Sequence, residues 1–296
     1  MSFLVNDFVV KYMKEICHGG IVLGKVKLIA TDLDGTFLTD DKHISQNNMK
    51  ALKAAVEKGV LFVPATGRGL FTMPESVMEL DCFRYIITSN GAAIEDMKDK
   101  CTIYKKQLDS DLTRDIIKYG LDLGIMVEIF IDGRAYTLEK FNKDLVGYGV
   151  NPKFVNWLRD TRTMVESFDN ILKNDTTVEN INLIFTDMNQ RVETYNYILE
   201  KYNVEITNSI GNNLEIGAKG CSKGEALEFL AGLLGINMSE VMCLGDNDND
   251  RDMIRRSGIG IAVKNADEKL KSSAGYIVSS NNEDGFAEAV ERFVLD

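Results

Sequence analysis

Six short apolar runs alternate with helical patterns, and this alternation constrains the fold more than any other feature of the chain. The runs lie at residues 26–30, 60–65, 85–89, 241–245, 258–263 and 276–278. Continuous apolar runs of this length are typical of strands that are buried on both faces, as in a parallel sheet. The sequence therefore predicts an α/β fold whose parallel sheet is covered by helices on both sides.

Two helices carry clear boundary signals. The first is predicted to begin after Ser45, a favoured N-cap residue, and to end at Gly59. The second is predicted to begin at Ser222, where Glu225 follows three residues later in a capping-box pattern. Lys223 then lies in the first turn of this second helix.

The middle of the chain has a different pattern. Residues 125–138 contain two β-runs around Asp132-Gly133, a strong hairpin signal, and a further strand is predicted at 181–187. A helix follows with Val192, Tyr195 and Leu199 on one face. These signals predict an antiparallel sheet with helices on one side. We predict an N-terminal extension (1–24), an α/β core (25–92 and 214–296) and an inserted α+β domain (93–213).

The composition disfavours several classes of protein. The 296 residues carry a formal net charge of −11, whereas a nucleic-acid-binding face needs a basic surface. No apolar run reaches the roughly 18 residues of a membrane-spanning helix. The five cysteines are scattered, odd in number and without a CxxC pair, which indicates a reducing compartment, and we expect a cytoplasmic protein. The sequence carries no signal for oligomeric state.

The run "DLDGT" (32–36) places two carboxylates directly after the first predicted strand. Asp32 and Asp34 stand two apart, and in open α/β sheets ligands bind beyond the carboxyl ends of the strands. Gly35 lets backbone N–H groups approach a ligand without a side chain in the way. A solvated turn is the alternative, because Asp and Gly are common at strand ends.

Two further positions could bind an anion. In "PATGRG" (64–69), Thr66 offers a hydroxyl donor after the second strand, and Gly67 keeps the backbone open. Lys223 lies at a helix N-terminus, an end that favours anions and is slightly unfavourable for a cation unless an anion is bound there. Taken alone, each has a simpler interpretation, as a structural turn and a surface lysine.

The run "LGDNDNDRDM" (244–253) ends another predicted strand in alternating carboxylates, namely Asp246, Asp248, Asp250 and Asp252. A calcium loop starting at Asp246 needs glycine at its sixth position and glutamate at its twelfth, where this chain has Arg251 and Ser257. The calcium-loop interpretation therefore fails. Carboxylates at two strand ends suit Mg²⁺, which takes one or two carboxylates together with substrate phosphate and water.

For several other residues the sequence gives only weak support for a functional role. Asn90, in a predicted turn after the third strand, could face the same sheet edge, and Arg134, beside the hairpin turn, could reach a phosphate or carboxylate, although a solvated arginine is the simpler interpretation. His18 and His43 have no evident nucleophile nearby, so proton transfer falls to carboxylates. We interpret Trp157 as a packing residue.

Together these runs resemble the four motifs of the haloacid dehalogenase superfamily of phosphatases, and most closely its Cof-type members with a class IIB cap. "DLDGT" resembles the first motif, "ATGR" the second, Lys223 in "SKGEAL" the third, and "GDNDNDRDM" the fourth. The resemblance covers residues 26 to about 285 and implies a Rossmann-like core with a cap domain. Phe37 in place of leucine, and the missing proline before the third motif, depart from the family pattern.

The resemblance implies a role for each motif residue. Asp32 would be the nucleophile that forms an aspartyl-phosphate, and Asp34 the general acid and base. Mg²⁺ would be held by the Asp32 carboxylate, the Asp34 backbone carbonyl and Asp246. The phosphoryl-binding residues would be Gly35, Thr66, Gly67, Lys223 and Asn249, with Asp250 supporting the loop.

The expected activity is Mg²⁺-dependent hydrolysis of a small phosphorylated metabolite, such as a sugar phosphate. Two alternatives remain open. One is a phosphotransferase or phosphomutase that passes the same aspartyl-phosphate to a hydroxyl. The other is a phospho-acceptor signalling domain, which also combines an acidic cluster with a threonine and a lysine. The predicted insertion of roughly 120 residues argues against the signalling domain, which is a single domain of ordinary size.

Overall fold

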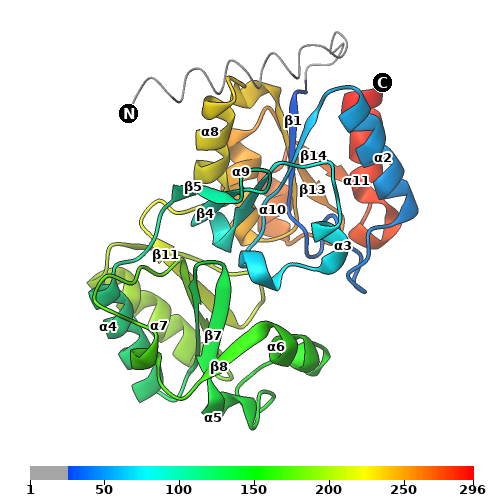
Figure 1. Ribbon diagram of the computed structural model, residues 1–296. Coiled ribbons are helices and arrows are strands. Elements are labelled where there is room, and N and C mark those ends of the chain that lie inside the picture. The colour runs from blue at the N-terminus through cyan, green and yellow to red at the C-terminus, as the bar shows by residue number, and fades with distance from the viewer. Residues whose placement is uncertain (1–25) are drawn as a thin grey trace, which may run out of the picture.

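The computed structural model describes residues 26–296, so the predicted N-terminal extension at residues 1–24 lies outside the described residues. Figure 1 shows two lobes, one built around a parallel sheet and the other around a mixed sheet. In the parallel sheet the strand order is β14-β13-β12-β1-β2, and every neighbouring pair is parallel. The α/β fold predicted from the apolar runs is confirmed.

The parallel strands coincide with five of the six predicted runs. Their bounds are β1 (Leu28–Thr31), β2 (Leu61–Pro64), β12 (Val241–Gly245), β13 (Ile259–Val263) and β14 (Tyr276–Val278). Every residue of β1 is buried, as a central strand with neighbours on both edges requires. Figure 1 shows helix α8 on one side of this sheet, and α2 and α11 on the other.

The sixth run belongs to a second, three-stranded sheet. It forms β3 (Tyr85–Thr88), which pairs antiparallel with β4 (Ala93–Asp96), and β4 pairs with β5 (Cys101–Lys105). A single parallel bridge between Ala65 and Ile87 places β3 beside β2. The prediction of a buried strand is therefore right, but most of its pairing is with a hairpin that the sequence analysis assigned to the insertion.

The third sheet has six strands in the order β10-β11-β9-β6-β7-β8. Their bounds are β6 (Met126–Ile131), β7 (Arg134–Leu138), β8 (Arg162–Val165), β9 (Asn180–Ile184), β10 (Val204–Thr207) and β11 (Asn213–Ala218). The hairpin at Asp132-Gly133 forms as predicted, with both residues at positive φ. All neighbours are antiparallel except β7 and β8. Figure 1 shows α4 and α7 against one side of this sheet.

The two helices with predicted N-terminal signals, α2 and α8, begin where those signals place them. The α-helices are α2 (Gln46–Glu57), α3 (Glu75–Met78), α4 (Ser110–Asp122), α5 (Glu139–Asn142), α6 (Val155–Thr161), α7 (Met188–Lys201), α8 (Lys223–Leu233), α9 (Arg251–Arg256), α10 (Glu268–Ser273) and α11 (Gly285–Val290). The 3₁₀ turns are η1 (Leu70–Thr72), η2 (Ser89–Gly91), η3 (Pro152–Phe154), η4 (Phe168–Asn170), η5 (Met238–Glu240), η6 (Asp248–Asp250) and η7 (Asn281–Glu283), and a π-helical turn, η8 (Glu291–Leu295), ends the chain.

Side-chain caps explain where the two predicted helices begin. Ser45 accepts a hydrogen bond from the Asn48 N–H, and Ser222 accepts one from the Glu225 N–H. The Glu225 side chain lies within ion-pair distance of Lys106 (3.5 Å) and Arg256 (3.3 Å), so its carboxylate is engaged away from the predicted capping box.

Two hydrophobic clusters divide residues 26–296. One contains buried side chains between residues 26 and 94 and between 226 and 294, and the other contains buried side chains between 108 and 216. Residues 103 and 104 of β5 pack against the first cluster. We therefore propose that the inserted domain begins after β5 rather than at residue 93, because the β4–β5 hairpin is paired with β3 and packed on the core. It ends after β11 rather than at residue 213, because β11 pairs within the six-stranded sheet.

The apolar face predicted for helix α7 is exposed to solvent rather than buried. On α7 the residues Val192, Tyr195 and Leu199 are 52%, 38% and 43% exposed, while Thr194 and Ile198 are buried against the sheet. Among residues 26–296, no helix combines the length and apolar character that crossing a membrane requires.

Candidate active site

The carboxyl ends of three parallel strands bring the predicted motif residues to one edge of the core sheet. Asp32 follows β1, Asp246 follows β12, and Thr66 follows β2 after one residue. The Asp32 N–H donates to the Leu244 carbonyl at 3.0 Å, which continues the β1–β12 ladder into the site. Since β1 lies between β2 and β12, Asp32 occupies the middle of this edge.

Lys223 lies at the centre of the charged groups and is not the surface lysine that its position alone suggests. The side chain is fully buried, and its Nζ donates to Asp32 Oδ1 and to Asp250 Oδ1, each at 2.7 Å. Burial would lower the pKa of Lys223, but the charges of Asp250 and Asp32 outweigh it and raise that pKa, so the ammonium stays protonated. Its position at the start of α8 delivers this charge to the sheet edge.

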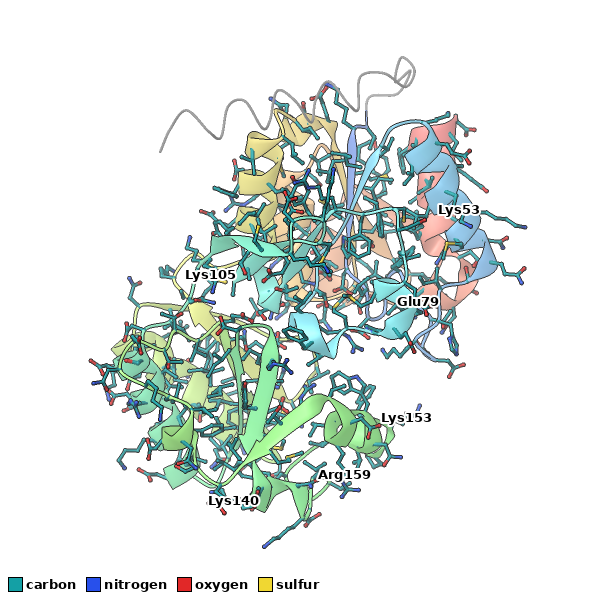
Figure 2. The ribbon with its side chains drawn as sticks, in the orientation of Figure 1. Lys53, Glu79, Lys105, Lys140, Lys153 and Arg159 are labelled. Carbon is teal, nitrogen blue, oxygen red and sulfur yellow. The ribbon has the colours of Figure 1, made fainter. Side chains whose placement is uncertain are left out.

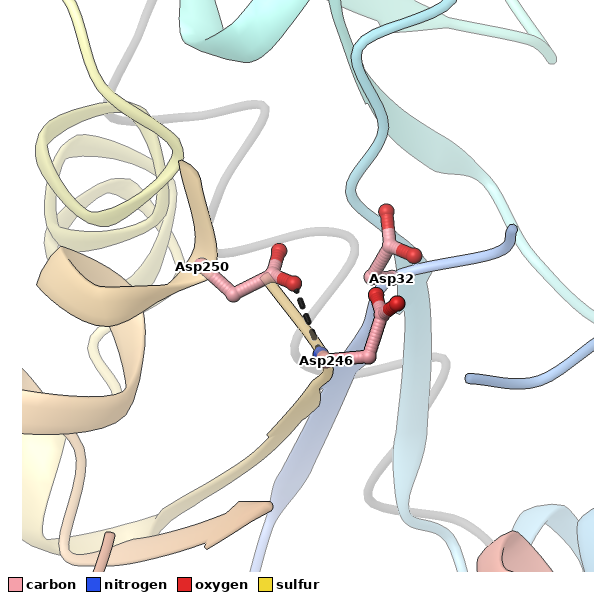
Figure 3. A group of neighbouring side chains, drawn as sticks. All are labelled: Asp32, Asp246 and Asp250. Atoms are coloured by element: carbon pink, nitrogen blue, oxygen red, sulfur yellow. Dashed lines mark hydrogen bonds between the residues drawn. The ribbon is translucent and has the colours of Figure 1, made fainter. Parts of the chain in front are cut away.

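Asp32, Asp246 and Asp250 form an acidic cluster in which one oxygen of each lies within 4.8 Å of the others (Figure 3). Burial raises the pKa of Asp32 to about 7, with a contribution from Asp250 and a partial offset from Lys223. Burial, together with the charges of Asp32 and Asp250, raises the pKa of Asp246 well above its ordinary value. Three carboxylates around one ammonium fit a divalent cation, and their hard oxygen donors fit Mg²⁺.

Asp250 differs from the other two carboxylates because both of its oxygens already have partners. Its Oδ1 accepts from Lys223, and its Oδ2 accepts from the backbone N–H groups of Asp246 and Asn247 at 2.9 and 3.1 Å. Figure 3 shows the bond to the Asp246 backbone. Asp250 therefore ties the loop after β12 to Lys223, in keeping with a supporting role.

Gly35 packs closely against the side chain of Asp246. Its φ is +85°, and a Cβ at this position would lie 2.5 Å from Asp246 Oδ2. Thr36 Oγ1 donates to the other oxygen of Asp246 at 3.3 Å. Glycine at position 35 is thus required for the Asp246 carboxylate to pack against the first motif, a reason in addition to the predicted approach of a ligand.

Thr66 and Gly67 form a tight turn beside Asn90. The buried Thr66 hydroxyl accepts from the Arg68 N–H at 3.1 Å, which leaves its own hydrogen to donate to an acceptor. A Cβ on Gly67 would lie 3.0 Å from Asn90 Oδ1. Asn249 Nδ2 donates to that same oxygen at 3.0 Å, so the second and fourth motifs meet at Asn90.

Asn90 also links the core to the inserted domain. Its Nδ2 donates to Glu215 Oε2 of β11 at 2.8 Å, and Ser89 Oγ donates to the buried Glu179 at 2.6 Å. The sequence analysis placed Asn90 at this edge without a partner. The partners of Ser89 and Asn90 are 90 to 159 residues away in sequence, and no local pattern identifies them.

Two cations that the sequence analysis did not select bind Asp34. Arg68 Nε and Nη2 donate to Oδ2 and Oδ1 at 2.5 and 2.8 Å, and Lys42 Nζ lies 2.7 Å from Oδ1. Burial alone would raise the pKa of Asp34, but the hydrogen bonds and charges of Arg68 and Lys42 hold it well below its ordinary value. Arg68 is the arginine of the quoted "ATGR" run, so a signal for it was present in the sequence.

The remaining predicted residues lie away from this cluster or have other partners. Arg134 lies with its guanidinium carbon 4.1 Å from the centre of the Phe71 ring, so its partner is an aromatic ring of the core. His43 is exposed, and His18 lies outside the described residues. The Asp40 carboxylate accepts a hydrogen bond from Asn281 Nδ2, and the Asp40 backbone N–H donates to Asn282 Oδ1.

Comparison with known proteins gives independent evidence for the family of this chain. A family model described as haloacid dehalogenase-like hydrolase matches residues 29–290. The 5-amino-6-(5-phospho-D-ribitylamino)uracil phosphatase YcsE of Bacillus subtilis (strain 168) is 32% identical over 270 residues, which cover 91% of this chain and 96% of the relative.

Two solved structures have the same fold. A haloacid dehalogenase-like hydrolase from B. subtilis superposes with a TM-score of 0.80 at 26% identity, covering 90% of this chain and 99% of that one. A sugar phosphatase of HAD subclass IIB superposes with a TM-score of 0.76 at 23% identity, again covering 90% of this chain and 99% of that one.

Proposed function

The chain belongs to the haloacid dehalogenase-like hydrolases and is a phosphatase, and from this premise we propose that it hydrolyses a small phosphorylated metabolite through an aspartyl-phosphate at Asp32. The observation that carries the proposal is the buried contact between Lys223 Nζ and Asp32 Oδ1 at 2.7 Å. A carboxylate nucleophile approaches an anionic phosphate only where cations neutralise the charge, and Lys223 supplies one at the nucleophile itself.

In the first step Asp32 attacks phosphorus and displaces the leaving alcohol. Thr66 donates its hydroxyl hydrogen to a phosphoryl oxygen, and Lys223 balances the charge that the phosphoryl group brings. The backbone at Gly35 and Gly67, and the amide of Asn249, complete the predicted phosphoryl-binding set. Splitting the hydrolysis through a covalent intermediate replaces one difficult step with two easier ones.

Asp34 transfers a proton in both steps. It gives a proton to the leaving oxygen in the first step and removes one from the attacking water in the second. The depressed pKa of Asp34 supports the second role directly, because the carboxylate is ionised. The first role requires that Lys42 and Arg68 Nη2 release Oδ1 when substrate binds, so that Oδ1 can hold a proton while Arg68 Nε stays bound to Oδ2.

The acidic cluster supports an Mg²⁺ cofactor. Asp32, the backbone carbonyl of Asp34 and Asp246 would hold the ion, while Asp250 keeps the loop in place. When bound, the ion supplies positive charge that stabilises the transferring phosphoryl group. The raised pKa values of Asp32 and Asp246 support this assignment, because Lys223 alone leaves the cluster short of positive charge.

Support for the substrate class comes from a relative and from one face of the six-stranded sheet. The relative YcsE is named for a phosphate on a ribityl chain. In this chain Glu128, Asn182 and Glu215 are register partners across β6, β9 and β11, so their side chains lie on one face, and all three are buried. Glu215 contacts Asn90 of the core. Amides and carboxylates recognise hydroxyl groups, which supports a polyol or sugar phosphate as substrate.

The experiment that tests this function compares Asp32→Asn with Asp41→Asn on an aryl phosphate in the presence of Mg²⁺. Asp41 is an exposed residue of the same acidic run and matches the charge change. We expect Asp32→Asn to lose turnover by at least about a thousandfold and Asp41→Asn to retain it. Undiminished turnover in Asp32→Asn would exclude Asp32 as the nucleophile.

Phosphotransfer to a sugar hydroxyl is the alternative that uses the same site. Release of inorganic phosphate from a sugar phosphate, without an isomerised product, separates hydrolysis from transfer. The family match does not support the phospho-acceptor signalling domain. A cytoplasmic location accords with the scattered, odd-numbered cysteines.

A further inference from the structure

The side chain of Asp34 is held by two cations from different loops. Arg68 contacts both carboxylate oxygens through two nitrogens, and Lys42 contacts Oδ1. Arg68 is itself fixed, because its Nη1 donates to the Thr72 carbonyl at 2.8 Å and its side chain is only 8% exposed. A carboxylate bound at both oxygens by a fixed guanidinium has one preferred orientation.

Two aromatic rings of the inserted domain lie on these same cations. The Arg68 guanidinium carbon is 4.7 Å from the centre of the Trp157 ring in α6, and Lys42 Nζ is 5.9 Å from the centre of the Phe154 ring in η3. Both distances are within the range of cation–π attraction, which is worth about 0.5–2 kcal/mol per contact. One short segment, residues 152–161, therefore reaches both cations that orient Asp34.

Trp157 is also bound firmly to its own domain. The Arg162 guanidinium carbon lies 4.3 Å from the centre of the Trp157 ring, and Arg162 Nε donates to Glu128 Oε1 at 2.8 Å. Glu128 is fully buried in β6. The charged residues Lys153 and Arg159 of the same segment are exposed (Figure 2).

We propose that Trp157 is a positioning residue for the acid step. When the inserted domain lies over the core, the Trp157 ring holds Arg68, and Arg68 Nε holds Asp34 Oδ2, so that Oδ1 is oriented toward the leaving oxygen. The Phe154 ring gives Lys42 a second partner when Lys42 releases Oδ1. The inference rests on the proposed function, because it takes Asp34 as the proton donor. Packing alone explains why Trp157 lies against the hydrophobic cluster of its own domain. Packing alone does not require its contact with the arginine that binds Asp34.

The dependence of rate on the leaving group tests this role. An alkyl phosphate such as glycerol phosphate needs a proton on its leaving oxygen, whereas 4-nitrophenyl phosphate leaves as a weakly basic anion and needs little help. We expect Trp157→Ala to lower kcat for glycerol phosphate by about tenfold to a hundredfold, and kcat for 4-nitrophenyl phosphate by less than about threefold. Trp157→Phe, which keeps a ring, should restore most of the alkyl phosphate rate.

Phe71→Leu is the matched control. Phe71 and Arg134 form another aromatic–guanidinium contact between the two domains, with 4.1 Å from the guanidinium carbon to the ring centre. Loss of this contact should leave the ratio of alkyl to aryl turnover unchanged.

Three results decide the inference. A selective loss of alkyl phosphate turnover in Trp157→Ala, with recovery in Trp157→Phe, supports it. An unchanged ratio, or an equal fall for both substrates, overturns it while the proposed function stands. A wild-type protein that hydrolyses neither substrate contradicts the proposed function, and this inference with it.

Discussion

Lys223 is the residue around which the charges of the site are balanced. It is fully buried between Asp32 and Asp250, and Asp246 adds a third carboxylate within a few ångströms. Charges buried in this way are tolerated only when they are paired and hydrogen-bonded. The raised pKa values of Asp32 and Asp246 indicate that one lysine does not fully compensate three carboxylates.

This imbalance predicts that stabilisation by Mg²⁺ depends on pH. In the metal-free protein the pKa of Asp32 is about 7, above the unfolded value near 3.9. The folded state therefore binds more protons than the unfolded state between about pH 4 and 7, and its stability falls as pH rises through that window. Mg²⁺ binds the deprotonated carboxylates, so we expect a larger rise in Tm with Mg²⁺ at pH 8 than at pH 5.5.

Differential scanning fluorimetry with and without Mg²⁺ at the two pH values measures this effect. Apparent Mg²⁺ affinity should be on the order of tenfold weaker at pH 5.5. Asp246→Asn serves as the control and should remove most of the shift at pH 8. The same Tm rise at both pH values, or an undiminished rise in Asp246→Asn, would contradict the metal assignment.

At the scale of elements, the turn η2 positions the start of α8. Gly91 has a φ of +95°, and a Cβ on it would lie 2.1 Å from the Ser222 carbonyl oxygen and 2.9 Å from the Lys223 nitrogen. The turn therefore packs directly on the helix end that carries Lys223. Gly235, which follows α8, has a φ of +68° but open space around the Cβ position.

The comparison of Gly91→Ala with Gly235→Ala isolates this packing. Both substitutions place alanine in the left-handed region, at a cost of roughly 1 kcal/mol. Gly91→Ala also forces a steric overlap with backbone, so we expect it to lower the free energy of unfolding by at least about 2 kcal/mol more than Gly235→Ala. Urea denaturation measures both values. Equal losses would show that η2 and α8 can separate without cost.

Local patterns predicted the elements well because their causes are local. Apolar runs located all six predicted strands of the core, Ser45 and Ser222 located two helix starts, and Asp132-Gly133 located a hairpin. The exposed face of α7 was not predictable in this way, since its apolar spacing is compatible with either of two helix faces being buried. Tertiary packing decided between them.

The residues of the candidate site likewise fall into two groups, those that local patterns identified and those that only tertiary contacts reveal. The motif residues Asp32, Thr66, Lys223 and Asp246 were found because each follows a strand or begins a helix. Lys42 and Trp157 were not found as partners of the site. Lys42 lies in a loop without a motif, and Trp157 reaches Arg68 only after the inserted domain folds over the core.

For the whole molecule, the central feature is an inserted domain that contacts the core at the site edge. Glu215 and Glu179 contact Asn90 and Ser89, and Trp157 contacts Arg68. A domain that contacts Arg68, which binds Asp34, would exclude bulk water from the proposed intermediate when it is closed. This arrangement suits a covalent aspartyl-phosphate, which would otherwise be exposed to uncontrolled hydrolysis.

The most direct test of the proposed intermediate uses Asp34→Asn, in which the proposed base for the second step is absent. The variant is mixed with 4-nitrophenyl phosphate and Mg²⁺, quenched in acid, digested, and its peptides are analysed by mass spectrometry. We predict a phosphoryl group on Asp32, and none in the double variant Asp32→Asn with Asp34→Asn. A phosphoryl group on another residue, or turnover without any phosphorylated peptide, would contradict the account.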